Sequence, residues 1–142
     1  MGELTPKRPP AYSFIGMAAG IASTLEGANK RFGTAILVGR ETYEQARETI
    51  EARLVGQLKP HFHPEPITAY EVLARKGTLE SCKMQAVARY LEGLAHYQAR
   101  RWEQALPAFT EALHLDPSDG PSRFYQERCE ALLAAPPEVI VL

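Results

Sequence analysis

Two histidines, His61 and His63, stand one residue apart in the segment H-F-H, a spacing that could serve metal binding. In an extended segment both imidazoles would lie on the same side, as a pair of metal ligands requires. No third cysteine, histidine or aspartate lies near them in the sequence. We therefore expect an ordinary loop at this position, and no metal site.

The acidic and nucleophilic residues also show no pattern that is typical of a catalytic site. Asp116 and Asp119 are the only aspartates of the chain, so any mechanism that needs an aspartate elsewhere is excluded. Thr78, Ser81 and Cys82 have no acid–base partner nearby in the sequence and are typical of a helix start. No phosphate-binding G-x-x-x-x-G-K-[ST] or G-x-G-x-x-G motif occurs anywhere in the chain. The residues alone therefore identify no catalytic centre and no cofactor site.

The charge balance excludes further classes of function. The 142 residues include 16 Lys+Arg and 17 Asp+Glu, which gives a net charge of −1. A protein that binds nucleic acid or an anionic membrane would show a basic excess.

No apolar stretch approaches the ~18 residues that a membrane span needs. We expect a cytoplasmic protein with no nucleic-acid and no membrane partner, and the two cysteines, which form no metal spacing, fit a reducing compartment.

Charge and hydrophobic periodicity divide the chain near Lys76-Gly77. Residues 1–76 hold ten basic and eight acidic residues, net +2, whereas residues 77–142 hold six and nine, net −3. In the first part the pattern predicts helices at 18–31 and 41–53 and strands at 34–38, 54–58 and 67–73. In the second part it predicts three helices, at 79–99, 102–115 and 121–134.

The expected apolar face of the 79–99 helix contains Met84, Val87, Leu91 and Leu94. Gly33 stands where the first helix should end, because glycine adopts the left-handed conformation of a helix cap without a Cβ penalty.

A longer motif lies between residues 12 and 75. Its segments are Y-S-F-I-G at 12–16, A-S-T-L-E-G-A-N-K-R-F-G-T at 22–34, I-L-V at 36–38, T-Y-E at 42–44, E-P-I at 65–67 and Y-E at 70–71. In this order they resemble the C-terminal part of a class III adenylate/guanylate cyclase domain, and they cover only its last third. The resemblance implies a multi-stranded sheet covered by helices, and a reaction that converts a nucleoside triphosphate to a cyclic nucleotide.

The resemblance fails at the positions that would carry this chemistry. In the family, two aspartates bind two metal ions, and an asparagine and an arginine on the helix after the I-G segment orient the ribose and stabilise charge on the phosphates. The aspartate strands would precede Met1. The asparagine position is Gly20, the arginine position is Thr24, and the aspartate that follows I-G is Met17. Ser13 stands at the base-selecting position, where its hydroxyl could still contact a purine.

This chain carries neither set of residues, so it could not complete a shared site with a second chain from either side. A truncated sheet of this size also leaves at least one strand edge unpaired. We expect self-association through that edge, packing on the helical part, or partial disorder as the remedy.

Residues 86–117 resemble one tetratricopeptide repeat. The motif positions are Ala86, Gly93, Ala105, Phe109, Ala112 and Pro117. Small residues at positions 93 and 105 would let two helices approach each other. Arg100 replaces the usual turn glycine, and Pro107 falls inside the second helix, where it removes one hydrogen bond. Because a single repeat rarely stands alone, the 121–134 helix would serve as its cap.

Five side chains of this helical part are candidates for protein interaction: Tyr90, Tyr97, Arg100, Arg101 and Trp102. The two arginines beside the tryptophan could bind an acidic peptide, or could form a solvated turn. The two tyrosines could line a peptide groove, or could pack within the helical hairpin.

The sequence thus predicts an α+β protein with a truncated, ferredoxin-like cyclase-homology region at 1–76 and a TPR-like three-helix module at 77–142. We expect a non-catalytic protein that acts in protein–protein interaction or in regulation linked to cyclic-nucleotide signalling. Its partner would be another protein or a second copy, with no cofactor and no bound small-molecule nucleotide. Two alternatives remain: an active cyclase or the C-terminal piece of one, and a nucleotide-sensing domain without turnover.

Overall fold

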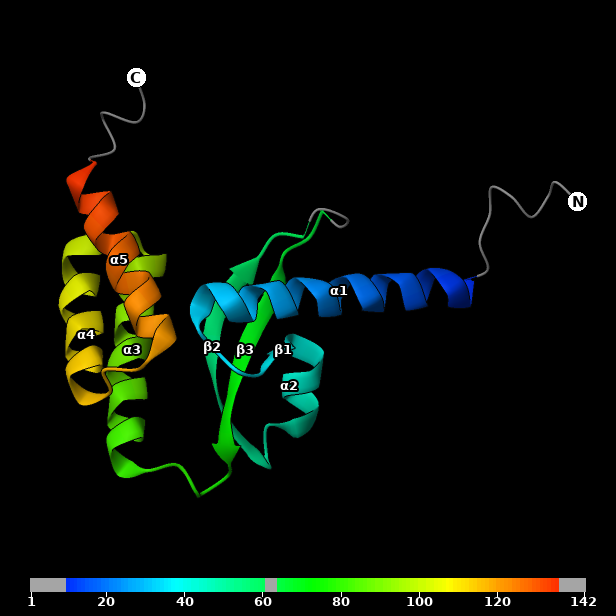
Figure 1. Ribbon diagram of the computed structural model, residues 1–142, viewed down its shortest axis with the longest axis horizontal. Helices are drawn as coiled ribbons and strands as arrows, with labels where there is room; N and C mark the ends of the chain where they lie inside the picture. The colour runs from blue at the N-terminus through cyan, green and yellow to red at the C-terminus, as the bar shows by residue number, and fades with distance from the viewer. Residues whose placement is uncertain (1–9, 61–63, 136–142) are drawn as a thin grey trace, which may run out of the picture.

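The computed structural model describes residues 10–60 and 64–135, with side chains from residue 19 onward. Within these ranges the chain forms five helices and a three-stranded antiparallel sheet, so the fold is mixed α+β (Figure 1). The elements are α1 (Pro10–Phe32), β1 (Leu37–Gly39), α2 (Arg40–Ala46), β2 (Ile50–Leu58), β3 (Ile67–Arg75), α3 (Ser81–Gln98), α4 (Trp102–Leu115) and α5 (Gly120–Ala134).

The sheet has the strand order β1-β3-β2. β2 begins at Ile50, so the expected helix over 41–53 is wrong at its end: α2 stops at Ala46. Thr49 ends the helix, because its backbone N–H and its hydroxyl both donate to the carbonyl of Ala46, at 2.8 and 2.9 Å. Residues 50–53 then pair with β3 from Arg75 backward. The spacing of apolar residues at 50–53 is compatible with a helix, but these residues form a strand because they pair with β3, which is distant in the sequence.

Helix α1 is longer than expected and passes across the sheet, with its N-terminal half extending beyond it (Figure 1). Its predicted end is confirmed, since Gly33 has a φ of +70° and the N–H of Thr34 bonds back to Asn29 at 3.0 Å. At this end α1 meets the start of α5 very closely: a Cβ on Gly120 would lie 2.1 Å from the carbonyl oxygen of Phe32.

Helices α3, α4 and α5 form a bundle beside β2 (Figure 1), and their bounds match the predicted ranges within two residues. The close approach of α3 and α4 takes place at Gly93, where an added Cβ would lie 2.9 Å from the ring of Phe109. The expected apolar face of α3 needs correction. Leu94 is buried there, but Met84 and Leu91 are exposed, because Tyr90 and the small residues of α3 make the contact with α4 instead.

One continuous buried core joins the sheet and the bundle. It contains Phe32 of α1 and Val55 of β2 together with Tyr90, Phe109 and Tyr125 of the bundle. The helix tyrosines also donate hydrogen bonds to β2, an edge strand of the sheet. The hydroxyl of Tyr125 donates to the carbonyl of Val55 at 2.6 Å, and that of Tyr90 donates to the carbonyl of Leu54 at 3.0 Å. Packing on the helical part therefore covers at least this stretch of the edge.

Candidate functional site

Helix α1 carries the positions at which the resemblance to cyclases leads one to expect catalytic side chains. Gly20 and Thr24 both lie on it, half-buried and one helical turn apart. The hydroxyl of Thr24 donates to the carbonyl of Gly20 at 3.0 Å. The hydroxyl thus bonds to its own helix, and the residue supplies neither a cation nor an amide. Ser13 and Met17 lie in the first half of α1, outside the residues whose side chains are described.

The two aspartates of the chain, Asp116 and Asp119, are both engaged in the structure. Asp119 is 2% exposed and caps the N-terminus of α5, where its Oδ2 accepts from the backbone N–H and the hydroxyl of Ser122, at 3.2 and 2.5 Å. Lys83 of α3 pairs with both aspartates, at 2.6 Å to Asp116 and 2.8 Å to Asp119. Asp119 therefore holds the start of α5 against α3, and Asp116 holds the end of α4 against it.

Arg53 of β2 is the centre of this cluster, and its side chain is fully buried. Its Nη1 donates to Oδ2 of Asp119 at 3.0 Å, and its Nη2 donates to Oδ1 of the same carboxylate. Its Nε donates to Glu71 of β3 at 2.8 Å, and its Cζ lies 4.6 Å from the ring centre of Tyr90. One guanidinium thus links the sheet to α3 and α5. We refer to Arg53, Glu71, Lys83, Asp116 and Asp119 as the buried ion cluster.

Within the cluster, the pKa values of Asp119 and Arg53 are shifted in the direction that keeps each side chain charged. Burial alone would raise the pKa of Asp119, but the hydrogen bonds and charge of Arg53, with those of Lys83, hold it well below its usual value. Burial alone would lower the pKa of Arg53, and the bonds to Asp119 and Glu71 raise it instead. The sequence gives weak signals of this site: a single arginine inside an apolar strand, and an aspartate just before the Gly-Pro start of a helix.

The five interaction candidates occupy different environments. Tyr90 is fully buried and belongs to the core, so no partner reaches its ring. Tyr97 is half-buried between Trp102 and Tyr125, at ring-centre distances of 5.1 and 4.8 Å. Arg100 is exposed and has a φ of +63°, a backbone conformation that costs energy in a residue with a Cβ. Arg101 is exposed, and its Nε lies 3.2 Å from Nδ1 of His96. The structure thus brings four of the five to one end of the α3–α4 hairpin, and leaves Tyr90 in the core.

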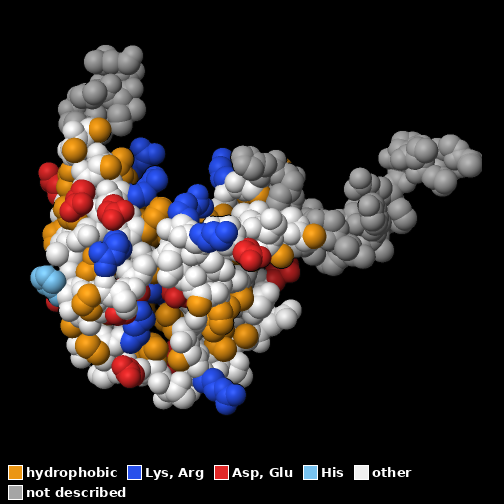
Figure 2. Space-filling view, in the orientation of Figure 1, with side chains coloured by type: hydrophobic (Ala, Val, Ile, Leu, Met, Phe, Trp, Pro, Cys, Tyr) orange, Lys and Arg blue, Asp and Glu red, His pale blue; other side chains and the backbone are white. Residues whose placement is uncertain are grey.

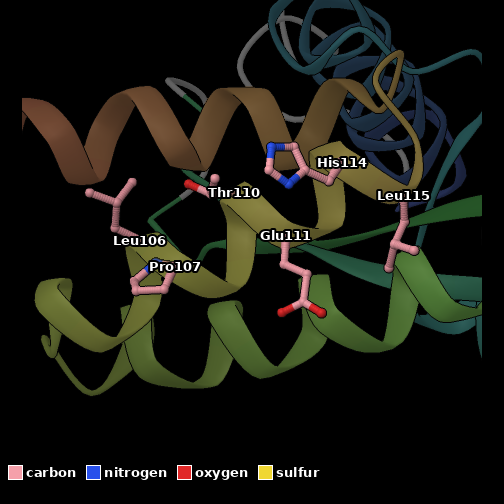
Figure 3. Close-up of a pocket in the computed structure, with 6 residues that line it drawn as sticks. All are labelled: Leu106, Pro107, Thr110, Glu111, His114 and Leu115. Carbon is pink, nitrogen blue, oxygen red and sulfur yellow. The ribbon is translucent and has the colours of Figure 1, made fainter.

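A hollow of about 690 Å³ lies along the outer side of α4 (Figure 3). All of its lining residues come from that one helix: Leu106, Pro107, Thr110, Glu111, His114 and Leu115. Glu111 already pairs with Arg89 of α3, and Thr110 accepts a hydrogen bond from Gln126 of α5 at 3.2 Å. A hollow with walls from a single helix does not enclose a small molecule.

Metal and membrane features can be assessed over the same residues. Within 10–60 and 64–135, no three His, Cys, Asp or Glu side chains stand close enough to share a metal ion. Over these ranges, too, no helix combines the length and apolar character of a membrane span. The His61 and His63 pair and the C-terminal residues 136–142 lie outside the described residues.

Comparison with known proteins finds similarity to adenylate cyclases. The "Adenylate cyclase, terminal-differentiation specific" of Dictyostelium discoideum is 28% identical over 119 residues, which is 81% of this chain and 6% of that protein. "Adenylate cyclase 1" of Rhizobium meliloti is 29% identical over 73 residues, which is 51% of this chain and 11% of that protein. No family model and no solved structure matches.

The extent of the first match is informative. It covers 81% of the 142 residues, which is more than either part of the chain contains, so it includes residues from both the sheet part and the helical part. The chain itself spans only about a tenth or less of the length of these two relatives. It is therefore similar, over most of its own length, to a short segment of a much larger adenylate cyclase.

Proposed function

We propose that this chain is a non-catalytic, cyclase-related protein that acts through protein interaction in cyclic-nucleotide signalling. The support begins with the similarity to two adenylate cyclases, which links the chain to this class of signalling proteins. The observation that carries the non-catalytic part is the state of α1. Thr24 bonds to the carbonyl of Gly20 at 3.0 Å, and neither residue offers the amide or guanidinium that a triphosphate transition state needs.

The buried ion cluster adds a second reason. Metal-dependent formation of a cyclic nucleotide needs carboxylates that are free to hold two metal ions. Asp119 is 2% exposed and bonded to Arg53, Lys83 and Ser122. Asp116 is paired with Lys83 on the other side. Asp119 joins the bundle to the sheet through Arg53, and Asp116 joins the end of α4 to α3, so both carboxylates are engaged in packing.

The helical part supports the interaction role, and we infer that it is a TPR-like module. The expected helix-contact positions Ala86, Gly93, Ala105 and Phe109 are all buried, and α5 packs on α4 as a capping helix would. The β2 strand and its tyrosine contacts occupy one side of this module. The end of the hairpin with Trp102 and the two exposed arginines remains accessible to a partner with acidic groups.

A cyclase assay tests the non-catalytic part of the proposal. The purified chain is incubated with ATP or GTP and with Mg²⁺ or Mn²⁺, and cyclic nucleotide is measured by mass spectrometry. We expect no product above the protein-free blank. Product that depends on this chain would overturn the proposal, and the Thr24→Ala variant would then show whether α1 contributes to the reaction.

A second measurement tests the regulatory part. The chain is added in increasing amounts to the adenylate cyclase of Rhizobium meliloti, and its own oligomeric state is measured by light scattering. We expect either a concentration-dependent change in the initial rate or a stable dimer of this chain. An unchanged rate together with a monomer at all concentrations would contradict a role in interaction.

A further inference from the structure

A second cavity, of about 440 Å³, opens where the sheet part and the helical part meet. Its walls come from the end of α1, the end of β2, and the facing sides of α3 and α5. Figure 2 shows Lys and Arg side chains on both sides of the notch between the bundle and α1. The volume lies within the range of small-molecule sites, about 300–1,000 Å³. Unlike the hollow on α4, this cavity has walls from four elements.

The floor of the cavity is apolar and rigidly packed. Phe32 is 5% exposed, Leu94 is 3% exposed and Tyr125 is 6% exposed. The ring of Phe124 lies 4.4 Å from that of Phe32, centre to centre. On the strand side Gly56 keeps the wall close, because a Cβ there would lie 2.5 Å from the hydroxyl of Tyr125. The floor therefore offers a preformed aromatic surface to a flat or branched apolar group.

The rim is cationic. Arg31 and Arg128 both line the cavity and are exposed, and no acidic side chain lines it. Each guanidinium rests near an aromatic ring: the Cζ of Arg31 is 5.6 Å from the centre of Phe32, and that of Arg128 is 5.7 Å from the centre of Phe124. The Nε of Arg128 also donates to the hydroxyl of Tyr97 at 3.1 Å. Among the residues that the structure describes, no carboxylate pairs with either arginine.

This charge does not follow from the overall composition, because the chain has a net charge of −1 and residues 77–142 have a net charge of −3. Neither guanidinium has a carboxylate partner among the described residues, and two such groups at the mouth of an aromatic cavity match a ligand that has an anionic head and an apolar body. We propose that this cavity binds a small organic anion, with an aromatic or branched body on the Phe32–Tyr125 floor and a carboxylate or phosphate group between Arg31 and Arg128. This proposal for the cavity does not depend on whether the chain converts nucleotides.

Fluorescence titration tests this proposal with anilinonaphthalene sulfonate as the anionic probe and the neutral N-phenylnaphthylamine as its counterpart. We expect the Arg31→Gln/Arg128→Gln variant to lose about tenfold or more in affinity for the sulfonate, and less than about twofold for the neutral probe, because only the charge-assisted hydrogen bonds are removed. The matched control is Arg47→Gln/Arg75→Gln, which removes two exposed positive charges, one at the C-cap of α2 and one at the end of β3, and should leave both affinities unchanged. Circular dichroism checks that each variant is folded.

Competition then separates the possible sources of the anionic group. Benzoate, nucleoside monophosphates and inorganic phosphate are each titrated against the bound sulfonate. Displacement by benzoate or by a monophosphate, but not by inorganic phosphate, supports the proposal and identifies the head group. Displacement by an acidic peptide alone, an equal loss of affinity in the control variant, or equal affinity of the wild-type chain for the two probes would overturn it.

Discussion

Removing the carboxylate of Asp119 should destabilise the protein far more than removing a surface charge. Asp119→Ser keeps a residue that caps a helix well, so the change isolates the ion pair from the cap. It leaves the guanidinium of Arg53, which is fully buried, with Glu71 as its one carboxylate partner in the cluster. Breaking a buried pair from one side costs about 3–5 kcal/mol, and we expect about 3 kcal/mol because Glu71 remains.

The double variant Arg53→Met/Asp119→Ser tests the reason for this loss. Replacing both partners removes the fully buried guanidinium together with the Asp119 carboxylate, and it leaves Glu71, 14% exposed, without the Arg53 partner. The double variant should therefore be more stable than the sum of the single effects implies, by about 2 kcal/mol or more. Arg89→Met is the matched control. Its pair with Glu111 is exposed, 37% and 51%, so its loss should cost at most about 1 kcal/mol.

Equilibrium unfolding in urea measures these values, with fluorescence of Trp102, the single tryptophan, and circular dichroism as independent probes. Acid adds a second readout. Because the folded pKa of Asp119 is depressed, its contribution is present above about pH 4 and is lost as the pH falls through the folded pKa, and Asp119→Ser should show less of this acid loss. Additive single effects, or a cost below about 1 kcal/mol for Asp119→Ser, would refute the reasoning.

Three further predictions concern stability. Burial raises the pKa of the Cys129 thiol to about 11. The stability that the neutral buried thiol contributes is therefore complete below about pH 9 and is lost as the pH rises through the folded pKa. In urea unfolding from pH 8 to 11, the free energy of unfolding should decline less for Cys129→Ala than for the wild-type chain, and an equal decline would contradict this. Arg100→Gly should stabilise by about 0.5–1 kcal/mol, because φ is +63° there; a lower melting temperature would count against it. Pro107→Ala should stabilise by about 1–2 kcal/mol, since Pro107 lies inside α4 and leaves the carbonyl of Glu103 without its usual donor; Pro107→Gly, which restores the N–H with weaker helix propensity, should gain less.

Local sequence determined the helical part of this protein. Apolar residues at helical spacing predicted α3, α4 and α5, and the end of α1 at Gly33 followed from the conformational freedom of glycine. The close approach of two helices expected at the small residue Gly93 is also observed, against the ring of Phe109. These features depend on neighbours within a few turns, so the linear pattern contains the information.

The positions tied to distant pairing were decided only by the tertiary structure. Residues 50–53 had helical spacing, yet they form β2 because they pair with a strand about twenty residues further along. Arg53 lies 66 residues from Asp119 in the sequence, and their hydrogen bonds form only when α5 packs beside the sheet. Likewise, the cavity between Arg31 and Arg128 has walls from four elements. No local pattern specifies such contacts, because the energy that selects them comes from burying charges and aromatic rings between elements.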